Sequence, residues 1–285
     1  MTQPAQWLER LCRISAAQAA PDRACAWPQH LGPDDWCMSP ELLSAYGTEL
    51  YEALDERQRR RLSFFEAVNF FSLNIWGERQ LIAGIAPRLY ARECDAISRY
   101  LQHFLAEENR HMALFAEFCG RYAGKVYRQK SWRAPRAHAG GEEEFLFFAR
   151  VLLFEEIVDR YNVAMAGDSR LPPIVRHINR THHRDESRHL AFGRRRVVEL
   201  FERYAPGWSP EALTRVREEL EAFLAASWRE YYNPEAYADA GVSDAYGFRQ
   251  RLLADDARQR HQAAFSADSI AYLRKHGILA AEGAR

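Results

Sequence analysis

Apolar residues recur every three to four positions along most of this chain, and no long stretch alternates apolar and polar residues with a period of two. A spacing of three to four residues places apolar side chains on one face of an α-helix, whereas half-buried strands need strict alternation. The pattern therefore predicts an all-α protein.

Prolines, glycines and capping residues set the expected helix boundaries. The four longest predicted helices cover about 51–86, 91–122, 142–166 and 172–204. Shorter helices are expected over 2–19, 209–231, 245–260 and 265–275, with an irregular arm at 20–39 and a basic loop at 123–141. We expect a single domain over 1–285, with an N-terminal helix and arm at 1–50, a four-helix core at 51–205 and a C-terminal helical extension at 206–285.

Seven ionisable residues interrupt the apolar faces of the four central helices. They are, in chain order, Glu78, Glu108, His111, Glu155, His182, Glu186 and His189. The order reads Glu, Glu-x-x-His, Glu, His-x-x-x-Glu-x-x-His, and residues three or four apart share one helix face. Two helical hairpins that each bring a lone Glu against a Glu-x-x-His motif predict the carboxylate-bridged two-metal site of a four-helix bundle.

Each motif taken alone has an ordinary explanation. A single Glu-x-x-His in a helical protein is usually a solvated pair, and a lone Glu usually lies on the surface. The complete set argues against this explanation, because charged groups are rarely buried unless they are paired or bind a metal. Glu155 and Glu156 are adjacent candidates, and the apolar pattern favours Glu155 because the neighbours of Glu156 are half charged.

Other polar residues near these motifs have less specific roles. Asp159 and Asp185 lie one helical turn or less from an expected ligand, so either could accept an imidazole N–H and fix its tautomer. His177 and His183 are expected to be exposed or outside the ligand set, and His103 and His138 to be ordinary. Mixed carboxylate and imidazole ligands suit iron or manganese, and the lack of cysteine ligands argues against a closed structural zinc site.

Composition excludes several classes of function. The 39 Lys and Arg residues balance the 39 Asp and Glu residues, so no basic field favours nucleic acid or an anionic membrane. No apolar run approaches the ~20 residues that a membrane-spanning helix needs, and residues 1–20 lack an apolar signal core. The five cysteines are scattered. We therefore expect a cytoplasmic protein with reduced thiols and no nucleic-acid or membrane partner.

With these residues assembled, the chain resembles the p-aminobenzoate N-oxygenase family, whose diiron enzymes convert aryl amines to hydroxylamine, nitroso or nitro products. The distinguishing feature is His182, one turn before the second Glu-x-x-His, which the usual six-ligand pattern of ferritins and ribonucleotide reductases lacks. The resemblance covers most of residues 50–280. It includes Arg59-Arg60-Arg61-Leu62, Tyr232-Asn233-Pro234-Glu235-Ala236-Tyr237, Tyr272-Leu273 and Gly277-Ile278-Leu279.

The resemblance implies a ferritin-like four-helix bundle in which all seven residues bind two iron ions, with a manganese–iron pair as the alternative, and O2 is the co-substrate. It implies N-oxygenation of a small aromatic amine in secondary metabolism, with electrons from a ferredoxin or reductase, by a homodimer. No catalytic residue is expected beyond the ligands. Phe71, Phe104, Phe148 and Tyr161 could line an aryl-amine pocket or serve only as core packing.

Two alternatives remain from the sequence. The same bundle could carry out C–H hydroxylation, desaturation or oxidative C–C cleavage, because fold and ligands do not decide the chemistry. Iron storage or ferroxidase activity is the other, and the N-terminal arm and long C-terminal extension disfavour it, since such a protein needs only a bundle of modal domain length.

Overall fold

The computed structural model describes residues 3–18, 26–92, 94–128 and 139–281, and regular secondary structure within these residues is entirely helical. The predicted all-α class is therefore confirmed. Cys25, His138 and parts of the predicted arm and loop lie outside the described residues. None of the helices in the described ranges is long and apolar enough to cross a bilayer.

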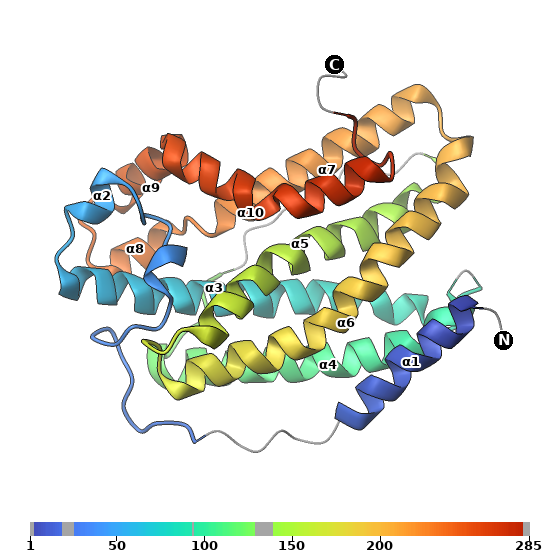
Figure 1. Ribbon diagram of the computed structural model, residues 1–285. Coiled ribbons are helices and arrows are strands. Elements are labelled where there is room, and N and C mark those ends of the chain that lie inside the picture. The colour runs from blue at the N-terminus through green and yellow to red at the C-terminus, as the bar shows by residue number, and fades with distance from the viewer. Residues whose placement is uncertain (1–2, 19–25, 93, 129–138, 282–285) are drawn as a thin grey trace.

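Four long helices form the central bundle: α3 (Glu56–Ile85), α4 (Ser98–Phe118), α5 (Glu142–Gly167) and α6 (Pro173–Tyr204). The closest packing is within the pairs α3–α4 and α5–α6, which are the two predicted hairpins. Helices α3 and α6 run in one direction, and α4 and α5 run in the other (Figure 1). If a residue of α3 and a residue of α6 lie at the same height along the bundle, the residues one turn before them are therefore displaced toward the same end of the bundle.

The first two bundle helices begin later than the sequence predicted. A capping box starts α3, in which Asp55 Oδ1 accepts from the Gln58 backbone N–H at 2.8 Å and the Gln58 side chain accepts from Asp55 N–H at 2.9 Å. The residues before it form the separate short helix α2 (Glu49–Glu52), capped by Thr48. Likewise a 3₁₀ turn at Asp95–Ile97 precedes α4, and a π-helical turn at Cys119–Ala123 follows it.

The outer helices cover the bundle on several sides (Figure 1). Helix α1 (Gln3–Gln18) packs on α4, and α8 (Pro234–Ala240) packs on α3. Helices α7 (Pro210–Glu230) and α10 (Asp256–Lys275) pack on α5, and α9 (Ala245–Ala254) connects α8 to α10. The predicted helices 245–260 and 265–275 are wrongly divided, because Asp255 caps the start of α10 by accepting from the Ala257 N–H at 2.8 Å. Helix α8 was not predicted, although Asn233 caps it and Gly241, at φ 94°, ends it.

Two glycines of α3 fix its register against α5. A Cβ atom added at Gly77 would overlap the ring of Phe154, and one added at Gly84 would overlap the ring of Phe147. The two contacts are seven residues apart on both helices, so they repeat after two turns. Since Gly77 precedes Glu78 and Phe154 precedes Glu155, this packing sets the two predicted ligands at one level of the bundle.

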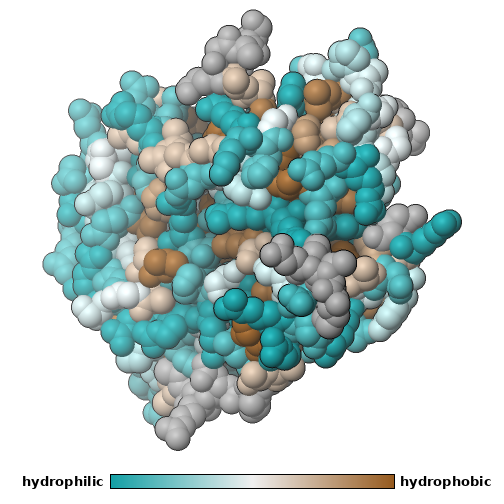
Figure 2. All heavy atoms as spheres, turned by 45° about the vertical axis from the view of Figure 1, so that its right-hand side comes forward, coloured by the Kyte–Doolittle hydropathy of each residue, from teal (hydrophilic) through white to brown (hydrophobic). Residues whose placement is uncertain are grey.

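The described residues on the face shown in Figure 2 do not form one dominant apolar patch. On the side shown in Figure 2, apolar patches are scattered among hydrophilic side chains. The large apolar side chains that are exposed among the described residues are Tyr46, Tyr90, Val163 and Tyr246. Isolated exposed apolar residues are normal on a soluble surface. They do not single out a dimer interface, so the homodimer remains a prediction.

Replacing Gly77 with alanine tests the glycine contact. The added methyl group must displace the Phe154 ring, and overpacking of this kind costs about 1–3 kcal/mol. We expect Gly77→Ala to lower the free energy of unfolding by that amount in urea denaturation. Gly120→Ala is the control, because nothing lies within 4 Å of a Cβ at that position. Equal stability of the two variants would contradict the proposed role of Gly77.

Candidate metal centre

The structure brings all seven predicted residues together in the middle of the bundle. Their possible ligand atoms form two groups, and within each group all of these atoms lie within 4.8 Å of one another. The larger group consists of Glu78, Glu108, His111, His182 and Glu186, and the smaller of Glu108, Glu155 and His189. Every side chain is buried. The two groups share Glu108, which is the arrangement of two adjacent cation sites with a common carboxylate.

The imidazoles face the cluster through different nitrogens. Nδ1 of His111 lies 2.9 Å from Glu108 Oε2, and Nδ1 of His189 lies 2.8 Å from Glu108 Oε1. The two oxygens of Glu108 therefore point to different histidines, as expected of a bridging ligand. His182 instead presents Nε2, which lies 2.9 Å from Glu186 Oε1 and 3.3 Å from Glu78 Oε1.

Several buried atoms of this cluster have no hydrogen-bond partner among the described residues. They are both carboxylate oxygens of Glu155 and Glu186 Oε2. Buried acceptors without a donor are costly, and native proteins rarely leave them unsatisfied. All of these atoms can donate a lone pair to a cation. The donor set therefore fits two divalent metal ions.

The protonation of the cluster in the absence of metal follows from burial and close charges. Burial, together with the neighbouring Glu108 carboxylate, raises the pKa of Glu78 well above its ordinary value. Burial and the Glu186 carboxylate raise the pKa of Glu155 in the same way. Burial opposes the charged form of His182, yet Glu186 and Glu78 raise its pKa to about 10. The metal-free cluster thus retains protons that bound cations would displace.

A second layer of carboxylates holds the far sides of two imidazoles. Asp185 Oδ2 lies 3.1 Å from Nε2 of His111, and Glu107 Oε2 lies 2.8 Å from Nε2 of His189. In each pair the carboxylate and the histidine come from different helices, α4 and α6. A carboxylate that accepts the Nε2 proton leaves the Nδ1 lone pair facing the cluster, which is the role such residues have around metal-bound histidines.

Arg188 joins the two outer carboxylates. Its Nη2 donates to Glu107 Oε1 at 2.6 Å and to Asp185 Oδ1 at 2.8 Å. Burial opposes ionisation of both acids, but the pKa of Glu107 is lowered by His189 and Arg188, and that of Asp185 by His111 and Arg188. Both outer carboxylates are therefore ionised.

The sequence predicted this outer layer only in part. Asp185 accepts from an expected ligand, as predicted, but Asp159 does not: its Oδ1 lies 2.7 Å from Nδ1 of His183, which is outside the seven. Glu107 was not predicted. A usable sign was present, because Glu107-Glu108-Asn109-Arg110-His111 and Asp185-Glu186-Ser187-Arg188-His189 both read acid-Glu-x-Arg-His.

The adjacent carboxylates Glu155 and Glu156 have different surroundings. Glu156 accepts from Arg194 Nε at 2.7 Å and from the hydroxyl of Ser269 on α10. Glu155 lies in the cluster, and neither of its oxygens has a hydrogen-bond partner there. The structure thus places Glu155 toward the cluster and commits Glu156 to the contact with α6 and α10.

Asn74 and Asn179 have unpartnered amide oxygens, as does Asn162, whose Nδ2 lies 2.9 Å from Nδ1 of His182. Asn74 Nδ2 donates to the Phe70 carbonyl and Asn179 Nδ2 to the Val175 carbonyl, both at 2.8 Å, but neither Oδ1 has a donor among the described residues. Both side chains are fully buried. Asn74 precedes Glu78 by one turn and Asn179 precedes His182 by nearly one turn. Since α3 and α6 run in the same direction (Figure 1), both amides lie on the same side of the cluster.

Aromatic rings pack against two of the three imidazoles, those of His189 and His182. The Phe104 ring stacks on His189 with the ring centroids 3.8 Å apart, and Phe115 meets His182 edge-on at 5.0 Å. Phe71 contacts Phe115 at 5.4 Å and therefore belongs to this wall. Tyr161 lies elsewhere, against Phe70 and Tyr231. Of the predicted aromatic lining, Phe104 thus contacts a cluster residue directly, and Phe71 does so through Phe115.

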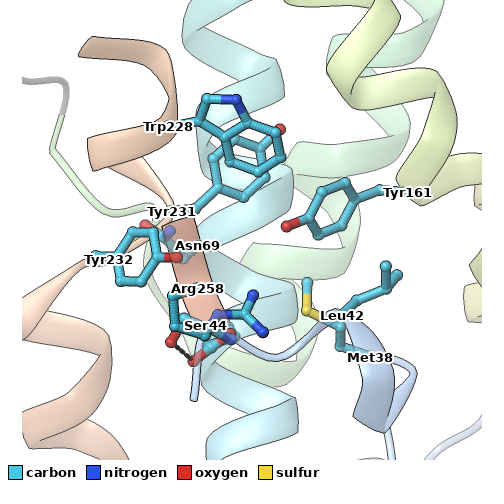
Figure 3. Close-up of a pocket in the computed structure, with 10 residues that line it drawn as sticks. Met38, Leu42, Ser44, Asn69, Tyr161, Trp228, Tyr231, Tyr232 and Arg258 are labelled. Carbon is cyan, nitrogen blue, oxygen red and sulfur yellow. Dashed lines mark hydrogen bonds between the residues drawn. The ribbon is translucent and has the colours of Figure 1, made fainter. Parts of the chain in front are cut away.

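A buried cavity lies apart from the cluster, and none of the seven residues lines it (Figure 3). It is lined by Met38, Leu42, Ser44, Glu66, Asn69, Tyr161, Trp228, Tyr231, Tyr232 and Arg258. Its volume of about 10 Å³ is roughly what one water molecule needs. Arg258 Nε and Tyr231 Oη have no hydrogen-bond partner in the described part of the chain, so both can bind such a water. The cavity is too small for an aryl amine.

The comparison with protein families agrees with the geometry. The model of the family described as P-aminobenzoate N-oxygenase AurF matches residues 2–277, nearly the whole chain. The matched range includes all seven cluster residues and both outer carboxylates. No curated protein matches the chain at a significant level.

The cavity residue Glu66 gives a test by pH. Burial raises the pKa of Glu66 to about 7, although Ser44 donates to its carboxylate. The pKa of Glu66 is higher in the folded than in the unfolded protein, so the folded state binds the proton more tightly. The stability that protonated Glu66 contributes is therefore complete below the unfolded pKa and is lost as pH rises through 7. Relative to Glu66→Gln, the wild type should lose about 2–3 kcal/mol of unfolding free energy between pH 5 and pH 8.

Urea denaturation of the metal-free proteins at the two pH values measures this difference. The control is Glu52→Gln, whose side chain is 71% exposed and which should follow the wild type. Parallel pH profiles of the wild type and Glu66→Gln would show that Glu66 titrates alike in the folded and unfolded states.

Proposed function

The chain belongs to the p-aminobenzoate N-oxygenase family, and from that premise we propose that it uses O2 to oxidise the amino group of a small aromatic amine. The family consists of diiron N-oxygenases, so the protein is an oxidoreductase that uses O2. The observation that supports the proposal most strongly is the buried pair of ligand groups that share Glu108.

We assign the seven residues to two iron ions. Glu78, Glu108, His111, His182 and Glu186 would hold one ion. Glu108, Glu155 and His189 would hold the other, and Glu186 is close enough to serve both, since its Oε1 lies 3.3 Å from Nδ1 of His189. When bound, the iron pair supplies the activation of O2. The three imidazoles make this donor set richer in nitrogen than a six-ligand carboxylate site.

The remaining protein groups hold and enclose the site. Glu107 and Asp185 keep the Nε2 protons of His189 and His111 in place, so that Nδ1 stays available as a ligand atom. The rings of Phe104 and Phe115 shield the imidazoles of His189 and His182 from water. A dry site protects a reactive oxidant from side reactions with solvent.

The unpartnered amides suit the amino group of the substrate. N-oxygenation needs a neutral amine, because the nitrogen lone pair forms the new N–O bond. The amide oxygens of Asn74 and Asn179 can accept N–H donors, and as neutral acceptors they stabilise an ammonium ion less than a carboxylate would. We therefore place the amine on the side of the cluster where these two residues lie.

The overall reaction sets the requirement for an electron donor. One oxygen atom of O2 becomes bonded to nitrogen, and the other leaves as water with two electrons and two protons from outside the substrate. A hydroxylamine is the first product. The electrons come from an external donor, for which we propose a ferredoxin or reductase, and repeated cycles would lead to nitroso and nitro products.

Iron loading tests the metal assignment. After anaerobic addition of Fe(II) and desalting, the wild type should retain about two irons per chain, as expected for a carboxylate-bridged bundle site. Glu155→Ala should retain about one or fewer. Glu156→Ala is the matched control and should retain both, because Glu156 bonds Arg194 and Ser269 instead. Iron-free wild-type protein would refute the assignment.

The loaded wild type is then given aryl amines, O2 and a chemical reductant, and mass spectrometry detects the hydroxylamine with one oxygen from ¹⁸O2. Oxygen found on carbon instead, or loss of hydrogen without oxygen insertion, would favour one of the other diiron oxidations.

Asn74→Leu and Asn179→Leu test the placement of the amine. Each change removes one acceptor with little change in volume, and loss of one hydrogen bond corresponds to about a 2- to 10-fold rise in KM. Iron content should stay at the wild-type value. Asn69→Leu is the control, since Asn69 lies on the same helix but bonds Asn233 and the Glu230 carbonyl. Wild-type KM values in both test variants would place the amine elsewhere.

A further inference from the structure

The N-terminal helix α1 contacts the outer layer of the metal centre. Ser15 Oγ accepts a hydrogen bond from Arg188 Nε at 3.0 Å, and the side-chain oxygen of Gln18 accepts from Arg188 Nη1. Ser15 is 1% exposed and Arg188 5% exposed. Two of the groups that hold this buried guanidinium therefore come from α1, a helix outside the four-helix bundle.

The same guanidinium orients both outer carboxylates. Arg188 Nη2 donates to Glu107 and Asp185, whose other oxygens face Nε2 of His189 and His111. A guanidinium is planar and its N–H donors have fixed relative positions. If Ser15 and Gln18 shift and the guanidinium of Arg188 rotates with them, its Nη2 atom must therefore move relative to Glu107 and Asp185. A continuous series of hydrogen bonds thus connects α1 to two proposed ligands.

We propose that docking of α1 and binding of metal stabilise each other through Arg188, with Ser15 and Gln18 as positioning residues. The inference depends on the proposed metal centre. The Nδ1 atoms of His111 and His189 face the cluster, so a metal held there would fix the imidazole planes and with them the directions of the Nε2 protons. The positions of Glu107 and Asp185 follow, and these in turn fix the orientation in which Arg188 faces Ser15 and Gln18.

Shielding from solvent adds to this coupling. Helix α1 keeps Arg188 away from water, and a charge-assisted hydrogen bond is stronger in a medium of low dielectric constant. If α1 leaves, water competes for the guanidinium, and its hold on Glu107 and Asp185 weakens. Linkage requires the two effects to be equal: the factor by which α1 docking raises metal affinity is the factor by which metal favours docking.

The remaining contacts of α1 supply a reporter and a control. Cys12 is a free thiol that is 2% exposed, so its reaction with an alkylating reagent reports undocking of the helix. Glu9 pairs with Arg99 of α4 at 2.8 Å, in a salt bridge whose side chains are 37% and 65% exposed. That pair holds α1 to the bundle without contacting Arg188, so its loss weakens docking while leaving the coupling intact.

The experiment compares the wild type, the double variant Ser15→Ala/Gln18→Ala and the control Glu9→Gln. Co(II) and anaerobic Fe(II) titrations give metal affinity, and iodoacetamide alkylation of Cys12, followed by peptide mass spectrometry, gives the docking of α1. In the wild type, metal should slow Cys12 alkylation about 3- to 10-fold. The double variant should bind metal about 3- to 10-fold more weakly, which is below the 10- to 100-fold typical of direct partners of a ligand.

In the double variant, alkylation of Cys12 should no longer depend on metal. In Glu9→Gln it should be faster with and without metal by a similar factor, and metal affinity should remain at the wild-type value. If the double variant fails to fold by circular dichroism, Gln18→Ala alone provides the same comparison at the last residue of the helix.

The outcomes separate this inference from the proposed function. Wild-type protein that binds two metal ions but shows the same Cys12 alkylation rate with and without them would overturn the coupling and leave the metal centre standing. Wild-type metal affinity in the double variant would do the same. Wild-type protein that binds no metal would overturn both.

Discussion

The burial of carboxylates at the centre of the bundle is the constraint on which the rest of the structure depends. Four carboxylates of the cluster and the two of the outer layer are all buried, and isolated buried charges are very unfavourable. The chain supplies only part of the compensation. Arg188 pairs with both outer carboxylates, and the imidazoles share protons with the inner four. The oxygens that remain without a donor converge on the space between the helices, and cations there would complete the balance.

Such a cluster can be stable only if four helices hold their ligands at one level. The hairpins α3–α4 and α5–α6 each bring a lone glutamate near a Glu-x-x-His motif, but the hairpins must also be aligned with each other. The contacts of Gly77 with Phe154 and of Gly84 with Phe147 provide that alignment, because each glycine admits a ring that no other residue would admit. Packing and ligand geometry are thus determined by neighbouring residues on the same two helices.

The sequence was sufficient for the helical class, the two hairpins and the seven cluster residues, since these follow from helical periodicity and motif spacing. It was not sufficient for contacts that depend on a partner helix. Glu107 could not be distinguished from a surface residue until α6 placed His189 beside it, and Asp159 was misassigned because its closest histidine is His183. Helix α8 was missed because a segment from Pro234 to Ala240 is too short for periodicity to identify. The role of α1 depends on Arg188, whose partners Ser15, Gln18 and Glu107 lie 173, 170 and 81 residues away in the chain.

The paired glycine contacts also limit how the interior can open. Helix α3 could slide along α5 only if both phenyl rings left their glycine positions together, and each ring would then meet a residue with a side chain. Packed interfaces of this kind change between discrete arrangements rather than by continuous sliding. Entry of a substrate must therefore come from side-chain rotation or from movement of the other helices. The two glycine contacts thus make the pairing of α3 with α5 resistant to sliding.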